Sequence, residues 1–146
     1  MRIRHTIHSI IVGAGLLLLA APAFALSLLP FSAGKSYPTP NSTCFVNFMG
    51  NFGVENSCST PQYWFIPLAV NQGSHTATLG VYSGGGLSCY LVSVYQSGTA
   101  YQSAHWTAPS GYQTGSLSVS SPASGSVYLE CSMNPGEMIL TVNYNE

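Results

Sequence analysis

Few side chains in this sequence could act as general acids or bases. Beyond residue 25 they are two histidines and four glutamates, because the chain has no aspartate: His75, His105, Glu55, Glu130, Glu137 and Glu146. General acid–base catalysis needs such groups held within reach of a substrate, and no glycine motif marks one of the serines as a nucleophile. The sequence therefore predicts that the protein is not an enzyme and has no catalytic residue.

Two of the glutamates flank a predicted turn at residues 134–136 (NPG). Glu130 and Glu137 could form the carboxylate pair of a glycosidase if the fold placed them on either side of a sugar. We expect instead a tight hairpin, on which both carboxylates are solvated charges at the strand ends.

All four cysteines lie beyond residue 25, and an even number of cysteines behind a secretion signal is typical of disulfides. Three pairings are possible. We favour Cys44 with Cys58, which bracket a segment rich in glycine and asparagine, and Cys89 with Cys131, which lie in phase with leucines on their strands. No two cysteines have the spacing of a zinc finger, so the sequence predicts no metal and no cofactor.

Nine tyrosines and two tryptophans give the chain an aromatic character. Tyrosine and tryptophan present a flat apolar face with a polar handle, which suits stacking on sugar rings or contact with a protein partner. The candidate binding residues are Tyr95, Tyr101, His105 and Trp106. The alternative is that the tyrosines cover the strands of a protein with few charges and that Trp106 belongs to the edge of the core.

The N-terminal residues have the pattern of a secretory signal peptide, which we predict over residues 1–25. Arg2 and Arg4 form a positive head, residues 10–21 are an apolar run, and Ala23 and Ala25 are the small residues that a signal peptidase requires. We expect cleavage after Ala25 and a secreted or periplasmic location. We also expect no membrane span in the mature chain, because the apolar run is shorter than the roughly 20 residues that a span needs.

Charged side chains make up only 5% of the chain, against roughly a quarter in an average soluble domain. After cleavage one lysine, Lys35, stands against four glutamates, which gives a formal charge of −3. Recognition of nucleic-acid phosphates needs clustered lysine and arginine. The composition therefore excludes a nucleic-acid partner.

Stretches of alternating apolar and polar residues predict antiparallel strands. The clearest are residues 75–82, which place Ala77, Leu79 and Val81 on one face, and residues 87–95, with a turn of three glycines between the two stretches. Residues 127–131 and 138–144 alternate on either side of the turn at 134–136, and we expect them to form a hairpin. Four apolar residues of the second strand are predicted to share a face: Met138, Leu140, Val142 and Tyr144.

Less distinct strands are expected at residues 44–49, 63–68, 99–106 and 115–120. Serine, threonine, glycine, tyrosine and valine dominate, and no window beyond the signal peptide has helical periodicity. The prediction is an all-β fold: a single antiparallel β-sandwich of immunoglobulin-like or jelly-roll type with about eight strands, stabilised by disulfides. It occupies residues 44–146 and follows an extended N-terminal arm at residues 26–43.

Several short motifs resemble a group of uncharacterised secreted bacterial proteins that have a signal peptide and about four cysteines. The motifs are residues 52–56 (FGVEN), 67–68 (PL), 87–89 (LSC) and 128–131 (YLEC), followed by residues 139–144. In that group a cysteine stands just before the Pro-Leu pair, where this chain has Ile66. The resemblance implies a secreted β-rich domain of bacterial origin and carries no known activity.

Two functions fit these observations. The first is a non-catalytic binding or surface-interaction module that recognises a glycan or an envelope protein through exposed tyrosines. The second is a structural or self-associating envelope protein, a homo-oligomer in which sheet edges pair between copies. The second possibility arises because the chain has no lysine or arginine after Lys35 to protect an edge strand.

Overall fold

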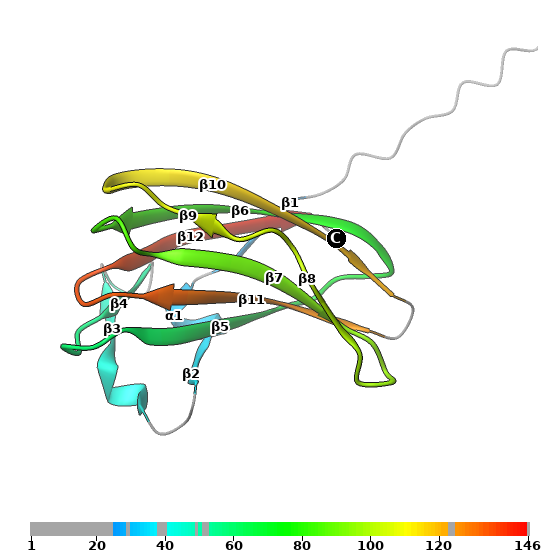
Figure 1. Ribbon diagram of the computed structural model, residues 1–146, viewed down its shortest axis with the longest axis horizontal. Helices are drawn as coiled ribbons and strands as arrows, with labels where there is room; N and C mark the ends of the chain where they lie inside the picture. Colours follow the sequence, from blue (N-terminus) through cyan, green and yellow to red (C-terminus); the bar gives the residue numbers. More distant parts are fainter. Residues whose placement is uncertain are drawn as a thin grey trace, which may run out of the picture.

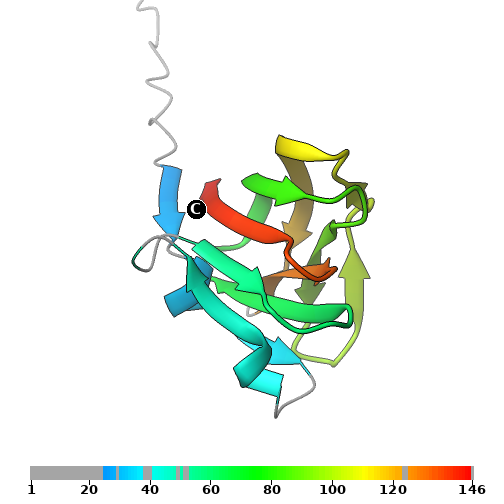
Figure 2. The same cartoon turned by 90° about the vertical axis from the view of Figure 1, so that its left-hand side faces the viewer.

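The computed structural model describes residues 25–28, 30–37, 41–48, 50, 53–122 and 125–145. The predicted signal peptide lies outside this part of the chain, apart from Ala25. The described residues form two antiparallel sheets that face each other across one core (Figures 1 and 2). The predicted all-β sandwich is confirmed, although it has twelve strands in the described residues rather than about eight.

The first sheet has five strands in the order β10 (Gly111–Ser121), β6 (Gly73–Ser83), β12 (Met138–Asn145), β4 (Gly53–Asn56) and β3 (Phe45–Phe48). A sixth strand, β1 (Ala25–Leu28), pairs with the second half of β12. Strand β10 pairs with β6 alone among the described strands, so it forms one edge of this sheet.

The second sheet has five strands in the order β2 (Lys35–Tyr37), β5 (Gln62–Leu68), β11 (Ser126–Met133), β7 (Ser88–Val94) and β8 (Ala100–Gln102). The short strand β9 (Trp106–Thr107) also pairs with β7, so β8 and β9 together form an edge. Two single-turn helices, α1 (Pro30–Ala33) and η1 (Asn41–Cys44), precede β3.

The predicted N-terminal arm therefore contributes β1 and β2, which pair with β12 and β5. The division of the chain at residue 44 stays a prediction. The strand count exceeds the expected number mainly because of short strands such as β1, β2 and β9, of two to four residues, in which alternation is too brief to recognise.

Alternation places the apolar residues of the long strands inside, as predicted. Ala77, Leu79 and Val81 of β6 are buried, and so are both cysteines of the second sheet, Cys89 and Cys131. These cysteines lie directly opposite each other on β7 and β11 and form a disulfide with a Cα–Cα distance of 4.1 Å. The pairing is the one expected from their phase with the leucines.

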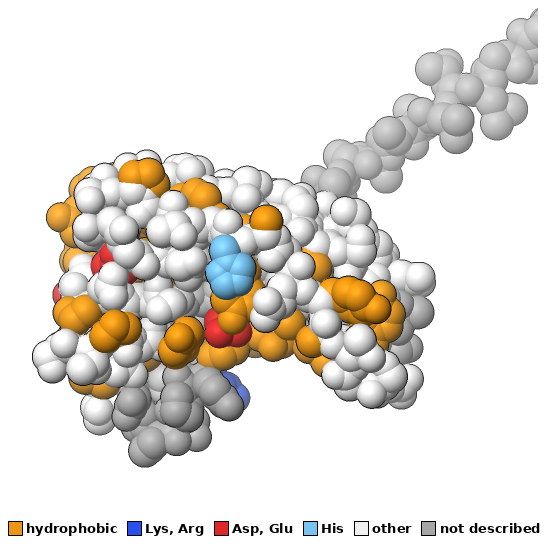
Figure 3. All heavy atoms as spheres, in the orientation of Figure 1, with side chains coloured by type: hydrophobic (Ala, Val, Ile, Leu, Met, Phe, Trp, Pro, Cys, Tyr) orange, Lys and Arg blue, Asp and Glu red, His pale blue; other side chains and the backbone are white. Residues whose placement is uncertain are grey.

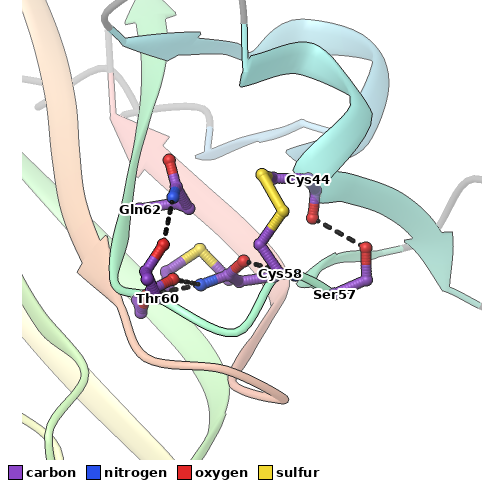
Figure 4. Close-up of a disulfide and its surroundings, with 7 residues drawn as sticks. Cys44, Ser57, Cys58, Thr60 and Gln62 are labelled. Atoms are coloured by element: carbon purple, nitrogen blue, oxygen red, sulfur yellow. Dashed lines mark hydrogen bonds between the residues drawn. A yellow bond between two sulfur atoms is a disulfide. The ribbon is translucent and has the colours of Figure 1, made fainter.

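The second disulfide joins Cys44 to Cys58, with a Cα–Cα distance of 4.9 Å. It is supported by the Ser57 hydroxyl, which donates a 2.9 Å hydrogen bond to the Cys44 carbonyl (Figure 4). Next to it, the buried amide of Asn56 donates to the carbonyls of Thr60 and Met133 and accepts from the N–H of Cys58. These contacts fix the chain where it passes from the first sheet to the second.

The predicted C-terminal hairpin is wrong, because β11 and β12 lie in different sheets (Figure 1). The turn at residues 134–136 carries the chain across the core, and the three glycines at residues 84–86 do the same between β6 and β7. Each strand has one apolar face, and two such strands can meet face to face across a core as well as edge to edge within a sheet. The alternation of apolar and polar residues in the sequence is the same in the two arrangements, so it does not distinguish them.

A β-bulge also changes the predicted face of β12. The register with β6 shifts between Ile139 and Thr141, so Leu140 is an extra residue on this strand. Ile139 therefore points inward with Val142 and Tyr144, and these three are buried, whereas Met138 and Leu140 are only half-buried. A single inserted residue reverses the phase of a strand.

Candidate functional site

A pair of exposed tyrosines lies where the edges of the two sheets meet. Tyr95 follows β7 and Tyr101 belongs to β8; their side chains are 38% and 55% exposed. The turn between them is closed by hydrogen bonds from the Tyr95 N–H to the Thr99 carbonyl and from the Gly98 N–H to the Tyr95 carbonyl. Gly98 has a φ of 87°, which favours glycine. The turn thus holds the two rings with their centroids 5.1 Å apart.

These tyrosines line a cleft of about 400 Å³, which we call the tyrosine cleft. Gln102 of β8 lies on the same side, and the opposite side comes from the first sheet: Ser74, Ser118, Val119 and Ser120. The cleft therefore needs both sheet edges, β8 from one sheet and β10 from the other.

The lining of the tyrosine cleft combines polar and apolar groups and carries no carboxylate, ammonium or imidazole group. Its side-chain hydrogen-bonding groups are serine hydroxyls, the Gln102 amide and the tyrosine phenols. Strand β10 also has one edge that pairs with no other strand of the described residues, and in an antiparallel ladder alternate residues direct their N–H and C=O groups to that side. The arrangement suits a neutral ligand that has both hydroxyl groups and a flat apolar face.

The other two predicted binding residues lie elsewhere. The strand expected at residues 99–106 is interrupted at Ser103, whose N–H donates to the Leu91 carbonyl and whose hydroxyl accepts from the Leu91 N–H. Beyond this interruption His105 is exposed and its ring stacks on Tyr90, with centroids 4.3 Å apart. Trp106 is half-buried and packs against the core, over the bare backbone of Gly115. Neither residue lines the tyrosine cleft.

Tyr90 belongs to a group of aromatic residues on the outer face of the second sheet. Its cross-strand neighbour is Glu130, with which it shares a hydrogen bond. Burial, followed by the hydrogen bond and charge of Glu130, raises the pKa of Tyr90, and burial with the Glu130 charge raises that of Tyr128. These phenols therefore stay protonated and neutral. Figure 3 shows how few charged side chains lie on the face it presents.

Glu137 is not the solvated charge that the sequence suggested. Its side chain is 1% exposed and accepts five hydrogen bonds at the two places where the chain crosses between sheets. Oε1 accepts from the Ser83 hydroxyl and the N–H groups of Gly84, Gly86 and Leu87, and Oε2 accepts from the N–H of Asn134 at 2.7 Å. Burial by itself raises the pKa of Glu137, but these donors outweigh it and hold the pKa below its ordinary value.

His75 is also buried, and its two ring nitrogens lie 2.8 and 3.1 Å from the carbonyl oxygens of Asn71 and Asn145. Both Glu137 and His75 are thus engaged by the backbone rather than directed at a ligand. Within the described ranges, no group of three or more histidine, cysteine or acidic side chains could hold a metal ion. No helix in this part of the chain is long and apolar enough to cross a membrane.

Sequence reasoning missed the half of the cleft that comes from the first sheet. Ser74, Ser118 and Ser120 belong to a chain rich in serine, and nothing in their local pattern distinguishes them. Ser118 and Ser120 become part of a site because β10 lies at a sheet edge opposite β8, and Ser74 because it pairs with Ser120 from the neighbouring strand β6.

No protein-family model matches the chain, and no curated protein matches it. The fold is similar to that of solved carbohydrate-binding modules. A module from Cellvibrio mixtus lichenase 5A in complex with cellotriose has a TM-score of 0.51 and 11% identity, over 83% of this chain and 96% of that one. The CBM35 from Cellvibrio japonicus Abf62 has a TM-score of 0.54 and 18% identity, over 83% and 92% of the two chains.

A third similar structure is the C-terminal CBM6 of LamC from Zobellia galactanivorans, a laminarinase. Its TM-score is 0.51 with 14% identity, and the match covers 84% of this chain and all of that module (100%). At these identities the likeness establishes a shared fold. The fold is a β-sandwich of the jelly-roll type, shared with these solved carbohydrate-binding modules.

Proposed function

We propose that this protein is a secreted or periplasmic, non-catalytic module that binds a glycan in the tyrosine cleft. The observation that carries the proposal is the cleft itself: two exposed rings, hydroxyl and amide groups, and no charged side chain in its lining. A sugar ring has an apolar C–H face and a rim of hydroxyl groups, and those two surfaces match the two kinds of group in the cleft.

Tyr101 is the more exposed of the pair and is positioned to stack against a sugar ring, with Tyr95 held at a 57° angle to it as a second wall. Ser118, Ser120 and Gln102 then hydrogen-bond the sugar hydroxyls. Because the lining is uncharged, the preferred glycan is neutral.

Two further observations support the proposal. Modules that share the fold bind carbohydrate, and one of them was solved with cellotriose. The two disulfides fit an oxidising compartment outside the cytoplasm, in agreement with the predicted signal peptide.

Titration calorimetry of the mature protein with neutral oligosaccharides, cellotriose first among them, tests this function. We expect Tyr101→Ala to weaken binding at least about tenfold, which corresponds to roughly 1.4 kcal/mol of lost stacking. Tyr63→Ala is the matched control, because Tyr63 is similarly exposed, at 43%, on the outer face of the second sheet. Binding that Tyr101→Ala and Tyr95→Ala both leave unchanged, or no binding of any neutral oligosaccharide, would contradict the proposal.

Self-association is the second candidate, and the observation that favours it is β10. This edge strand has 11 residues, carries no charged side chain and runs beside β6 without a break in register. Natural sheets usually protect such edges with lysine, proline or a bulge. Sedimentation over a hundredfold concentration range tests this candidate: Ser116→Lys should abolish any dimer, and a monomer throughout removes the possibility.

A further inference from the structure

The outer face of the first sheet carries a hollow of about 250 Å³, which we call the sheet-face hollow. It is lined by residues of β6, β10 and β12, among them Gly80, Tyr112, Thr114, Leu140 and Thr141. Tyr112 and Ser118 lie six positions apart on β10, so the sheet-face hollow and the tyrosine cleft are separated by about 20 Å at the usual rise of a strand.

A missing side chain makes this hollow. Thr114, Gly80 and Thr141 stand side by side on β10, β6 and β12. Gly80 leaves a notch between the two threonines, and a Cβ atom at this position would come within 2.5 Å of the Thr141 hydroxyl oxygen. The bulge at Leu140 places that apolar side chain beside the notch. The floor is thus bare backbone, with a hydroxyl group on either side.

An aromatic wall stands at one end of the sheet-face hollow. Tyr112 is 74% exposed, the highest value among the large apolar side chains of the described residues. Its cross-strand partner is Tyr82, and the two ring centroids are 5.0 Å apart with the rings tilted by 58°. The contact with Tyr82 restrains Tyr112 although solvent surrounds most of its ring.

A second hollow of about 210 Å³ lies on the same face, lined by Thr76, Thr78, Asn143, Tyr144 and Asn145. In the register between β6 and β12, the next outward-facing pair after Gly80 and Thr141 is Thr78 and Asn143. Successive outward pairs along a strand are about 7 Å apart, so the two hollows lie end to end along β6. Neither has a charged side chain in its lining.

We propose that this face of the first sheet is a second glycan site, which binds a neutral, linear oligosaccharide lying along β6. One sugar ring stacks on Tyr112 over the Gly80 notch, with Thr114 and Thr141 hydrogen-bonding its hydroxyl groups. The next sugar lies over Thr78 and Asn143. The choice of a sugar as ligand rests on the proposed function, whereas the location of the site rests on the hollows and on Tyr112.

NMR titration of the isotope-labelled mature protein with cellotriose, and then with longer neutral oligosaccharides, tests the second site. We expect two separate groups of shifted amides, one at Tyr101 and Ser118 and one at Gly80, Tyr112 and Thr141. Tyr112→Ala should weaken binding at the face about tenfold or more, a loss of at least one stacking contact, and leave the cleft unchanged. Tyr112→Phe, which keeps the ring, should keep binding at the face. Gly80→Ala should displace the Thr141 hydroxyl group from beside the notch and weaken binding at the face.

Tyr101→Ala should weaken binding at the tyrosine cleft and leave binding at the sheet face unchanged. Tyr63→Ala should affect neither group of amides. If oligosaccharides shift only the amides of the cleft, the second site is wrong and the proposed function stands. If they shift only the amides of the sheet face, the tyrosine cleft is not a glycan site and the sheet-face site stands. If shifts at the face survive both Tyr112→Ala and Gly80→Ala, the site is wrongly located. An absence of shifts at both surfaces overturns both proposals.

Discussion

The two ends of the sandwich are held in different ways. At one end, on the left of Figure 1, the chain crosses between the sheets at residues 84–86 and 134–136, and Glu137 is buried between these crossings. Asn56 and both disulfides lie next to the same connections. We call this the clamped end. At the other end Tyr95 and Tyr101 are exposed on a hairpin turn and face the free edge of β10.

We expect this difference to separate stability from the proposed binding. The clamped end buries its polar groups and satisfies them with the backbone, so a change there removes hydrogen bonds that water cannot easily replace. The two tyrosines of the cleft are exposed and lie outside the hydrophobic core, so they can be replaced at little cost. The predictions below test this contrast.

The largest loss of stability is expected for Glu137→Ala. The substitution leaves the buried N–H of Leu87 and its neighbours without an acceptor, and each buried donor that stays unpaired costs about 1–3 kcal/mol. We therefore expect the free energy of unfolding to fall by at least about 3 kcal/mol. Urea denaturation followed by tyrosine and tryptophan fluorescence measures it. A loss below about 1 kcal/mol would mean that the crossings do not depend on this carboxylate.

Glu137 also predicts how stability responds to acid. Its pKa is held below the ordinary value of 4.5 in the folded protein, so its contribution is present above pH 4.5 and is lost as the pH falls through the lowered pKa. Glu137→Gln should flatten the dependence of unfolding free energy on pH below 4.5. A dependence on pH that is unchanged in Glu137→Gln would contradict this assignment.

Removal of the Cys89–Cys131 disulfide should have the next largest effect. The bond closes a loop with a sequence separation of 42 and is fully buried. Cys89→Ala with Cys131→Ala should lower the free energy of unfolding by about 2–5 kcal/mol. An unchanged melting temperature for the double variant would show that strand pairing, rather than the disulfide, fixes β7 beside β11.

A smaller effect is expected where Trp106 packs on β10. A Cβ atom at Gly115 would come within 2.2 Å of the Trp106 ring, so Gly115→Ala must displace that ring. Overpacking of this kind costs about 1–3 kcal/mol. Ser116→Ala is the control. Ser116 is the next residue on β10 but its side chain is exposed, so this substitution should be nearly neutral. Equal effects of the two substitutions would argue against close packing of Trp106.

The smallest effect on stability is predicted for Tyr101→Ala, which should change the free energy of unfolding by no more than about 0.5 kcal/mol. The same variant should bind oligosaccharide at the tyrosine cleft at least about tenfold more weakly. Calorimetric binding and urea denaturation of one preparation provide both measurements. A large loss of stability would mean that the tyrosine pair is part of the structural framework, and the contrast between the two ends would fail.

Several features of the fold could be predicted because they depend on local pattern. Ala77, Leu79 and Val81 alternate with polar residues, and all three are buried in β6. Cys89 and Cys131 are in phase with neighbouring leucines, and they are paired and buried. In both cases a period of two in the sequence is the period of the strand itself.

Other features could not be predicted because they depend on which strands become neighbours. The candidate site illustrates the limit: Tyr95 and Tyr101 come together across a short turn, whereas His105 and Trp106 are carried away by the interruption at Ser103. That interruption depends on hydrogen bonds to Leu91 of β7, which the sequence around Ser103 does not reveal.

The sequence by itself determined that this chain forms a sparsely charged, disulfide-linked β-protein, because composition and alternation act residue by residue. Only the tertiary structure decided that β11 and β12 lie in opposite sheets, that Glu137 is buried between two crossings, and that serines of β10 complete the tyrosine cleft. The physical reason is that a strand with one apolar face satisfies the core equally well in either sheet. The choice between them is made by contacts with the rest of the chain, among them the bulge at Leu140 and the backbone donors that the Glu137 carboxylate pairs.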